Sequence, residues 1–358
     1  MVRYTRGLFK GVVNRLALIV FAMLFLLSET NSLAQDESQQ RLRFEYNRPI
    51  MGTELKLILY AQSESQAALA INAILEELEQ RAIPINNYTP HSEVSRLANL
   101  EPGKSQILSH ELSEVLIESK RWHELSDGAF DVTAGATIEL WNIARKQKML
   151  PSNHEILNAQ KNSGWDHLKL VSKSDSQTTL TIDAKELRIN VSGIATGYLL
   201  DHAMTILKQQ GIESALIDIG GDIIVSHPPP GSDGWKVDVA GLNQSDPIHS
   251  RIIMRDQAIT TSGDLNQFTK IDGIRYSHIV DPTTGKPVPR RVSATVVAKR
   301  AIDADAAATA IAVLGCLRVL RLLENMPIDS VVILEQDAIE TEGNASRIQR
   351  FEWDRTLP

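Results

Sequence analysis

The chain has 358 residues, with 37 Lys and Arg against 44 Asp and Glu, which gives a formal charge of −7. Apolar residues make up 43% and charged residues 23%, so a wholly disordered chain is excluded. The acidic balance argues against general nucleic-acid binding, which needs a cationic surface. Cys316 is the single cysteine, which excludes an internal disulfide, a cysteine zinc site and an iron–sulfur cluster.

The first 34 residues are predicted to be an export signal that does not belong to the fold. A basic start precedes an unbroken apolar run at residues 16–27, and Ser32-Leu33-Ala34 offers a small-residue cleavage site. The apolar run is shorter than the roughly 20 residues that a membrane-spanning helix needs. The alternative is an uncleaved signal that anchors the protein in the inner membrane. Both interpretations predict a protein exported to the periplasm.

The next part of the chain is predicted to hold a strand and two helices, after a polar, flexible lead at residues 35–41. Apolar and polar residues alternate over residues 53–59, which is typical of a half-buried strand. Ser63 is expected to cap the following helix, and Gln66 completes a capping-box pattern. A second helix is expected between residues 109 and 127.

The rest of the chain is predicted to alternate between short strands, turns and helices. Residues 142–187 are mixed and polar, which indicates loops and a hairpin. The other predicted elements are a helix that follows a turn at 193–197 and ends at Gly211, strands at 215–219, 223–225, 235–239, 292–298 and 331–334, an Ala-rich helix at 305–314 that ends at Gly315, and a polar tail at 337–358. This interleaving predicts an α+β fold with mixed sheets rather than a doubly wound parallel sheet.

Several common enzyme motifs are absent from the sequence. It has no GxxxxGK[ST] loop and no GxGxxG after a strand, which argues against a P-loop nucleotidase and a Rossmann dinucleotide site. It also has no GxSxG elbow. His110-Glu111, His123-Glu124 and His154-Glu155 each lack the second His that would complete a zinc-binding helix.

Two clusters combine small residues with hydrogen-bonding groups. In residues 127–135, Asp131 would accept a hydrogen bond from a ring N–H and Phe130 would form an apolar wall, with a helix stop and turn as the alternative. In residues 190–198, glycines let the backbone approach a ligand, and the next helix directs free N–H groups and its positive dipole end there. This pattern favours a pyrophosphate site, with a plain capped turn as the alternative.

Two further clusters carry oxygen donors and a histidine. His278 lies in a strand-like stretch between the hydroxyl-rich residues 260–264 and the turn at 281–285, and a purely structural histidine is the alternative. Asp305 and Thr309 are four residues apart, so on a helix they share one face, with about 5–6 Å between their Cβ atoms. They form a plausible partial Mg²⁺ shell. The alternative is helix capping by Asp305 and a Thr hydroxyl bonded to the preceding turn.

At these residues the sequence resembles the FAD:protein FMN transferase family (ApbE family) of exported flavin-handling enzymes, from about Pro49 to Leu334. The matching blocks, in order, are Met51-Gly52-Thr53, Asn87-Tyr88 with Ser92-Glu93 and Ser95-Arg96-Leu97, Asp127 to Gly135, Gly193 to Tyr198, Ile219-Gly220-Gly221-Asp222, Thr261-Ser262-Gly263, Ser277-His278 with Asp281-Pro282 and Gly285, and Ala304 to Ala310. The resemblance implies one catalytic domain over residues 42–336, with a flavin cleft between two α+β lobes.

The resemblance also implies a set of ligand-binding residues, with FAD as substrate and Mg²⁺ beside its pyrophosphate. The implied FAD contacts are Met51, Tyr88, Ala129, Phe130, Asp131, Asn190, Thr196, His278 and Ile279. The implied Mg²⁺ ligands are Asp305, Thr309 and the carbonyl groups of Gly193 and Ala308. Many relatives carry Asp in place of Asn190 and Lys or Glu in place of Thr196, which would alter hydrogen bonding and pyrophosphate binding.

The activity implied by the resemblance is phosphoryl transfer. A threonine hydroxyl of an acceptor flavoprotein attacks the FMN-side phosphorus of FAD, FMN becomes esterified to it, and AMP leaves. His278 is hypothesised to take the acceptor proton or to steady the phosphate. Membrane electron-transfer subunits are the implied acceptors. The alternatives are a Mg²⁺-dependent FAD pyrophosphatase that gives FMN and AMP, a non-catalytic flavin-binding protein, and a scaffold without a ligand.

Overall fold

The computed structural model describes residues 41–50, 52–172, 177–239, 241–242, 250–264, 267–337 and 348–356. The predicted export signal, most of the predicted lead and Met51 lie outside the described residues. Residues 43–358 form one compact unit. Among the helices that the structure describes, none is both long and apolar enough to span a membrane.

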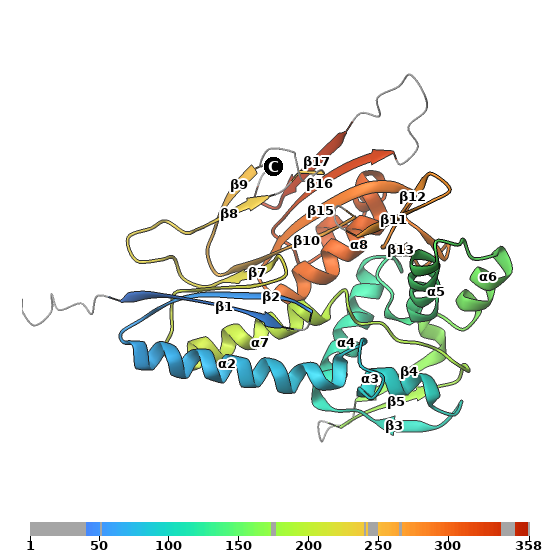
Figure 1. Cartoon of the computed structure of the whole chain (residues 1–358), viewed down its shortest axis with the longest axis horizontal. Helices are drawn as coiled ribbons and strands as arrows, with labels where there is room; N and C mark the ends of the chain where they lie inside the picture. Colours follow the sequence, from blue (N-terminus) through green and yellow to red (C-terminus); the bar gives the residue numbers. More distant parts are fainter. Residues whose placement is uncertain are drawn as a thin grey trace, which may run out of the picture. The chain divides into compact units, whose positions relative to one another are not determined.

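An eight-stranded sheet forms the centre of this unit (Figure 1). In spatial order its strands are β1 (Leu42–Ile50), β2 (Thr53–Ala61), β6 (Ala215–Ile219), β7 (Asp222–Val225), β10 (Gln257–Gly263), β15 (Arg290–Ala298), β16 (Ser330–Asp337) and β17 (Gln349–Asp354). The α+β class is confirmed. The sheet differs from the expectation in that every neighbouring pair from β2 to β17 is antiparallel, because tight turns such as Gly220-Gly221 join consecutive strands.

The two faces of the sheet pack against different layers, as the period of two along a strand requires. On β2, Leu55, Leu57 and Leu59 point into the main core, whereas Ile58 belongs to a second core. A hairpin of β8 (Trp235–Val239) and β9 (Ser250–Met254) closes that second core.

Three long helices form the main core together with the sheet. α2 (Glu64–Ile85) begins after Ser63, whose hydroxyl accepts from the Gln66 N–H as predicted, although the Gln66 side chain accepts from Gln62 rather than from Ser63. α7 (Ala195–Gln209) packs against α2 and α8 (Ala301–Val319), and α8 lies against β10 and β15 (Figure 1). Gly315, the predicted end of this last helix, has φ of 71°, so helical dihedral angles break there.

The other helices and the smaller sheets belong to the same unit. α4 (His110–Leu125) starts at the predicted Ser109 cap. The other elements are α3 (Glu93–Arg96), α5 (Gly135–Gln147), α6 (Asn153–Lys161), a sheet of β3 (Ser105–Ile107), β5 (Thr178–Ile182) and β4 (Leu168–Ser172), and two hairpins, β11 (Phe268–Ile271) with β12 (Ile274–Ser277) and β13 (Val280–Asp281) with β14 (Lys286–Pro287).

Two sequence predictions differ from the observed elements. Residues 142–187 hold the expected hairpin of β4 and β5, but they also hold the end of α5 and all of α6. These helices bury few side chains and pack through a small cluster that includes Trp141, Ile156 and the distant Val280. The predicted polar tail contains β17, which pairs with β16 at the edge of the large sheet. In both cases the stabilising partner is remote in sequence, so a local pattern does not show it.

Candidate active site

Two neighbouring cavities are lined by residues from several parts of the chain. The smaller cavity, of about 320 Å³, is lined by Ala129–Val132, Ala134, Ile138, Asn190, Ser192, Gly193, Gly220, Asp222, Thr260–Gly263, Gln267, His278–Val280, Pro282, Asp305, Thr309 and Val313. The larger cavity, of about 640 Å³, is lined by Gly52, Thr53, Ala82, Ile85–Tyr88, Ser192, Ala195, Thr196, Leu199, Ile219, Gly220, Asp222 and Gln267. Ser192, Gly220, Asp222 and Gln267 line both, so the two cavities form one continuous cleft.

A polar turn at residues 189–193 brings the backbone to the centre of this cleft. The Asn190 carboxamide oxygen accepts from the Ser192 N–H at 3.0 Å, which folds the chain into an Asx turn. The Asn87 side chain holds the segment with two hydrogen bonds: it donates to the Ile189 carbonyl at 2.7 Å and accepts from the Val191 N–H at 2.8 Å. The Gly193 backbone is therefore held from both sides as it enters α7.

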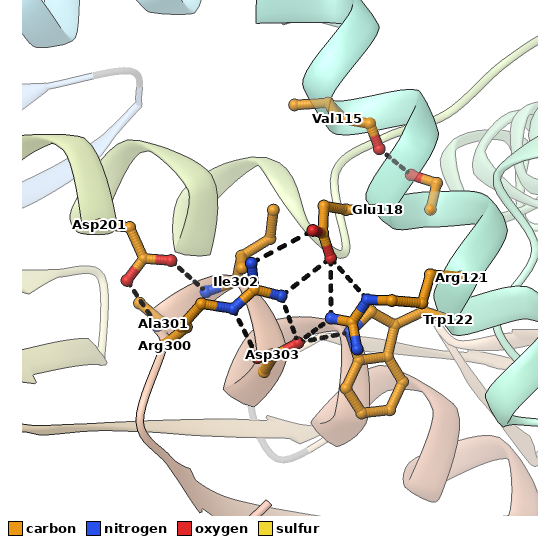
Figure 2. Close-up of polar contacts among 10 residues, drawn as sticks. Val115, Glu118, Arg121, Trp122, Asp201, Arg300, Ala301, Ile302 and Asp303 are labelled. Atoms are coloured by element: carbon orange, nitrogen blue, oxygen red, sulfur yellow. Dashed lines mark hydrogen bonds and ion pairs between the residues drawn. The ribbon is translucent and has the colours of Figure 1, made fainter. Parts of the chain in front are cut away.

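Helices α7 and α8 cap each other next to this turn. The Asp305 carboxylate of α8 accepts from the Gly197 N–H in the first turn of α7 at 3.0 Å. In return, the Asp201 carboxylate of α7 accepts from the Ala301 and Ile302 N–H groups at 2.7 and 3.1 Å (Figure 2). The start of α7 was expected to offer its N–H groups to a ligand, but the Gly197 N–H is already taken by Asp305.

The residues predicted to bind Mg²⁺ converge on one wall of the smaller cavity. A Cβ atom added to Gly193 would lie 2.9 Å from Thr309 Oγ1, so the absence of a side chain lets the turn reach the Thr309 hydroxyl. Thr309 Oγ1 lies 3.2 Å from Ser262 Oγ. Asp305 and Thr309 both line the cavity from α8. Ala308 is buried within that helix and does not line the cavity.

Two carboxylates face this wall without a cationic partner. Asp305 is 4% exposed, and within the described residues neither Asp305 nor Asp222 has a Lys, Arg or His nitrogen within 4.0 Å. Burial raises the pKa of Asp305 to about 7, although the Gly197 N–H opposes the rise. Burial raises the pKa of Asp222 as well, and the nearby Asp305 charge raises it further. Paired carboxylates without a counter-charge are the surroundings that a bound cation would stabilise.

This set of oxygen atoms suits a hard divalent cation. The described residues contain no group of three His, Cys, Asp or Glu side chains placed to hold a metal ion. The wall instead offers the Asp305 carboxylate, the Thr309 hydroxyl and the Gly193 backbone, with Asp222 close by. Mg²⁺ prefers such a sparse oxygen shell, because substrate phosphates and waters complete its octahedron. The oxygen atoms of these residues are therefore suitable ligands for the predicted Mg²⁺ ion.

His278 lines the same cavity in a defined tautomer. Its Nδ1 lies 3.1 Å from the Gln267 carbonyl oxygen, and because a carbonyl accepts, Nδ1 carries the proton. Burial lowers the pKa of His278, and the charge of Arg145 lowers it further. The imidazole is therefore neutral at pH 7, with an unprotonated Nε2 that is able to accept a proton.

The chain is similar in sequence and in structure to known proteins. The sequence model described as "ApbE family" matches residues 51–333. The protein named FAD:protein FMN transferase of Vibrio cholerae is 30% identical over 93% of this chain and 98% of that relative. The protein of the same name from Escherichia coli K12 is 27% identical over 74% of this chain and 76% of the relative.

This chain belongs to the ApbE family. The solved flavin transferase ApbE from Vibrio cholerae superposes with a TM-score of 0.72 at 29% identity, covering 87% of this chain and 97% of that one. The ApbE protein from Thermotoga maritima superposes with a TM-score of 0.74 at 27% identity, covering 86% of this chain and 97% of that one. In both cases the similarity extends over more than four fifths of this chain.

Most residues that the ApbE resemblance assigned to FAD line the cleft of this chain. Ala129, Phe130, Asp131, Asn190, His278 and Ile279 line the smaller cavity, and Tyr88 and Thr196 line the larger one. Met51 lies outside the described residues. Asp131 has a structural task as well, because its Oδ1 accepts from the Thr133 N–H at 2.8 Å and from the Thr133 hydroxyl at 2.6 Å. The Tyr88 side chain is 85% exposed at the edge of the cleft.

Sequence reasoning missed several residues of this ApbE site. Asp222, Asn87 and Ser262 lie in the matching blocks, but no role was predicted for them from the sequence. Their roles depend on partners far along the chain: Asn87 holds residues 189–191, and Ser262 reaches Thr309. The Gly-Gly-Asp order at 220–222 is an ordinary turn sequence, so it gave no separate signal for Asp222.

Proposed function

We propose that this protein transfers FMN from FAD to a threonine hydroxyl of an acceptor protein and releases AMP, with Mg²⁺ as the cofactor. The observation that carries the proposal is the convergence of His278, Asp305 and Thr309 on one cavity in a chain of the ApbE family. The names of the relatives support flavin transfer as the activity. The cleft supports it independently, because two connected cavities offer room for the two halves of a dinucleotide.

Proton transfer in this reaction is assigned to His278. The acceptor hydroxyl attacks the FMN-side phosphorus, a new P–O bond forms, and the bond to the bridging oxygen breaks so that AMP leaves with the electron pair. The hydroxyl proton passes to Nε2 of His278, whose Nδ1–H is held by the Gln267 carbonyl. Because burial and Arg145 lower the pKa of His278, the ring is unprotonated and ready to act as a base at neutral pH.

The polar wall of the cavity would hold the magnesium ion. Asp305, Thr309 and the Gly193 carbonyl would bind it, with Asp222 close enough to contribute. When bound, the ion neutralises phosphate charge that develops during the transfer. The chain itself does the positioning, because Asn87 and the Asn190 turn fix the backbone at Gly193, and the caps between α7 and α8 fix Asp305.

We also propose that the protein works outside the cytoplasm. The basic start, the apolar run at residues 16–27 and the Ser32-Leu33-Ala34 cleavage pattern support export to the periplasm. Extracytoplasmic flavin domains of membrane electron-transfer subunits would then be within reach as acceptors. Amino-terminal sequencing of protein taken from the periplasm tests the export step, and a mature chain that begins at Gln35 is expected.

A flavinylation assay tests the activity. The purified protein is incubated with FAD, Mg²⁺ and an acceptor protein that carries one target threonine, and the products are separated on a denaturing gel. Covalent fluorescence on the acceptor, together with AMP in the supernatant, is the expected result. The control acceptor carries Ala at the target position and must stay dark.

The same assay separates the competing functions. Free FMN with a dark acceptor indicates FAD pyrophosphatase activity, in which water takes the place of the threonine hydroxyl. Unchanged FAD that nevertheless raises the thermal unfolding temperature indicates a flavin-binding protein without catalysis. Unchanged FAD and no thermal shift indicate a scaffold, and each of these three results contradicts the proposal.

A further inference from the structure

Trp141, in the middle of α5, connects this helix to the segment of chain that carries His278. Its indole Nε1–H donates to the Gly285 carbonyl at 2.8 Å. Its ring stacks on Tyr276, with ring centroids 5.7 Å apart and 24° between the ring planes. Tyr276 precedes His278 by two residues and Gly285 follows it by seven, so one indole contacts the chain on both sides of the histidine.

Trp141 belongs to a small apolar cluster that is separate from the main core. The buried members are Trp141, Ala144, Ile156 and Val280, and Ile138, Leu140 and Tyr276 pack against them. Ile138 and Val280 also line the smaller cavity, whereas Trp141 lines neither cavity of the cleft. The indole therefore supports the wall of the cleft from behind, without forming part of its surface.

The turn at residues 281–285 is held by α6 as well as by Trp141. α5 and α6 pack against each other (Figure 1). The Gln160 side-chain amide of α6 donates to the Thr283 carbonyl at 3.1 Å. Gly285 has φ of 65°, and a Cβ atom added there would lie 2.6 Å from the Gln160 side chain. The turn that follows His278 is therefore seated closely against both helices.

His278 is held directly through a single atom of the protein. Its backbone N–H and its Nδ1 both lie 3.1 Å from the Gln267 carbonyl oxygen. Two contacts to one oxygen fix a pivot, and the position of the ring around that pivot depends on where the neighbouring chain is held. Catalytic groups must be placed within about 0.5 Å of the productive geometry. Misplacement by about 1 Å costs as much as about 100-fold in rate.

We propose that Trp141 is a positioning residue for His278, because its contacts with Tyr276 and Gly285 keep the imidazole where it meets the acceptor hydroxyl. The inference rests on the proposed function, in which His278 is the base. Since Trp141 has no surface in the cleft, its contribution to the reaction passes through the histidine. Loss of the indole N–H should therefore slow transfer and leave FAD binding nearly unchanged.

A purely structural role is the simpler explanation, since Trp141 is only 5% exposed. Trp235 of β8 provides a matched control. It is 6% exposed, its Nε1–H donates to the His227 carbonyl at 3.0 Å, and its ring packs edge-on against Tyr60. It belongs to the second core and lines neither cavity. A structural role predicts that both Trp→Phe variants lose stability alone, whereas positioning predicts an additional loss of transfer at Trp141.

Steady-state transfer assays on the purified protein test the proposal. Wild type, Trp141→Phe and Trp235→Phe are compared with FAD, Mg²⁺ and the acceptor protein, and FAD affinity is measured by calorimetry. Phe keeps a ring that can stack on Tyr276 but removes the N–H donor. We expect the kcat of Trp141→Phe to fall by about 10- to 100-fold, with FAD affinity within a few-fold of wild type. Trp235→Phe should keep the wild-type kcat.

A double variant shows whether Trp141 acts through the histidine. If its contribution is the position of the imidazole, Trp141→Phe has no further effect once His278 is replaced by Ala. We therefore expect His278→Ala and the double variant Trp141→Phe/His278→Ala to release AMP at the same residual rate. An equal loss from Trp141→Phe in both backgrounds overturns the proposal, as does a wild-type kcat in Trp141→Phe.

Gln160→Met keeps the test decisive if Trp141→Phe does not fold. It preserves the length of a half-buried side chain and removes the donor to the Thr283 carbonyl. It should lower kcat by a smaller factor, and only when His278 is present. A wild-type kcat in Gln160→Met would then overturn the proposal. Failure of the proposed function appears differently, as a wild-type protein that labels no acceptor.

Discussion

Two aspartates on the first turns of α8 have opposite surroundings, although each is only 4% exposed. Asp303 accepts hydrogen bonds from Arg121, Arg300 and the Trp122 indole, and the guanidinium groups in turn contact Glu118 (Figure 2). Asp305, two residues later, accepts from the Gly197 N–H and lies near a second carboxylate, Asp222.

The difference separates a structural region from a reactive one. Burial alone would raise the pKa of Glu118, but Arg300 and Arg121 more than offset it, so its pKa is lowered. Charges that satisfy one another stabilise the helix junction and leave little capacity for a ligand. At Asp305 and Asp222 the negative charge is left uncompensated, and their pKa values rise. The folded chain thus leaves two carboxylates uncompensated beside the cavity where a cation is expected to bind.

The largest expected effect comes from removing the uncompensated charge. Asp305→Asn keeps an oxygen that can accept from the Gly197 N–H but loses the negative charge. We expect flavin transfer to fall by about 10³-fold, because charge neutralisation by a metal contributes several kcal/mol. Mg²⁺ should raise the thermal unfolding temperature of wild type and leave that of the variant unchanged. Wild-type transfer rates in Asp305→Asn would remove this residue from the metal site.

A second change affects the reactive region without touching its charge balance. His278→Ala should reduce transfer by about 10²–10⁴-fold, which is the usual contribution of a general base. Affinity for FAD should stay within a few-fold of wild type, since the histidine acts on the acceptor proton. Steady-state rates at several acceptor concentrations measure the effect. A variant that keeps transfer within a few-fold of wild type would show that His278 is not the base.

A substitution in the structural region should lower the stability of the protein and leave its activity nearly unchanged. Asp303→Asn removes one of the two carboxylates that Arg121 and Arg300 share, so we expect a loss of about 1.5–3 kcal/mol in the free energy of unfolding. This estimate is moderate because both guanidinium groups are partly exposed. Urea unfolding measures the loss, and the protein that remains folded should transfer FMN at nearly the wild-type rate. If Asp303→Asn and Asp305→Asn both lose mainly stability, or both lose mainly transfer activity, the distinction between the two regions is wrong.

A further effect is a pH dependence of stability in metal-free protein. Asp305 has a pKa of about 7 in the folded state against 3.8 as its ordinary value, so between these two values the folded state holds a proton that the unfolded state releases. Stability should therefore fall as the pH rises from about 4 to about 7. Urea unfolding across this range, repeated on Asp305→Asn, isolates the contribution. An equally steep fall in the variant would assign the effect to other groups.

Local sequence patterns predicted much of the framework. The alternation at residues 53–59 and the serines at positions 63 and 109 correspond to β2 and to the starts of α2 and α4. Such signals are strong because the period and the cap are complete within a few residues. α6 and β17 escaped because each depends on partners elsewhere: α6 buries Ile156, and the partly exposed β17 depends on pairing with β16.

In the candidate site, too, local patterns predicted some residues and missed those that depend on distant partners. Asp305 and Thr309 were predictable because one helical turn joins them, and His278 because polar groups flank it. Three other features of the site join distant parts of the chain and could not be predicted locally. They are the hydrogen bonds of Asn87 to residues 189–191, the contact of Ser262 with Thr309, and the carboxylate pair of Asp222 and Asp305.

The mutual caps of α7 and α8 restrict how this protein can vary in length. Gly197 and Asp201 on one helix, and Ala301 and Asp305 on the other, are each separated by four positions, so every helix offers its N–H donor and its acid on one side. Inserting a single residue between the two members of either pair would rotate the carboxylate by about 100° around the helix axis, relative to the N–H group. These two short stretches therefore cannot gain or lose a residue without separating each acid from its N–H partner.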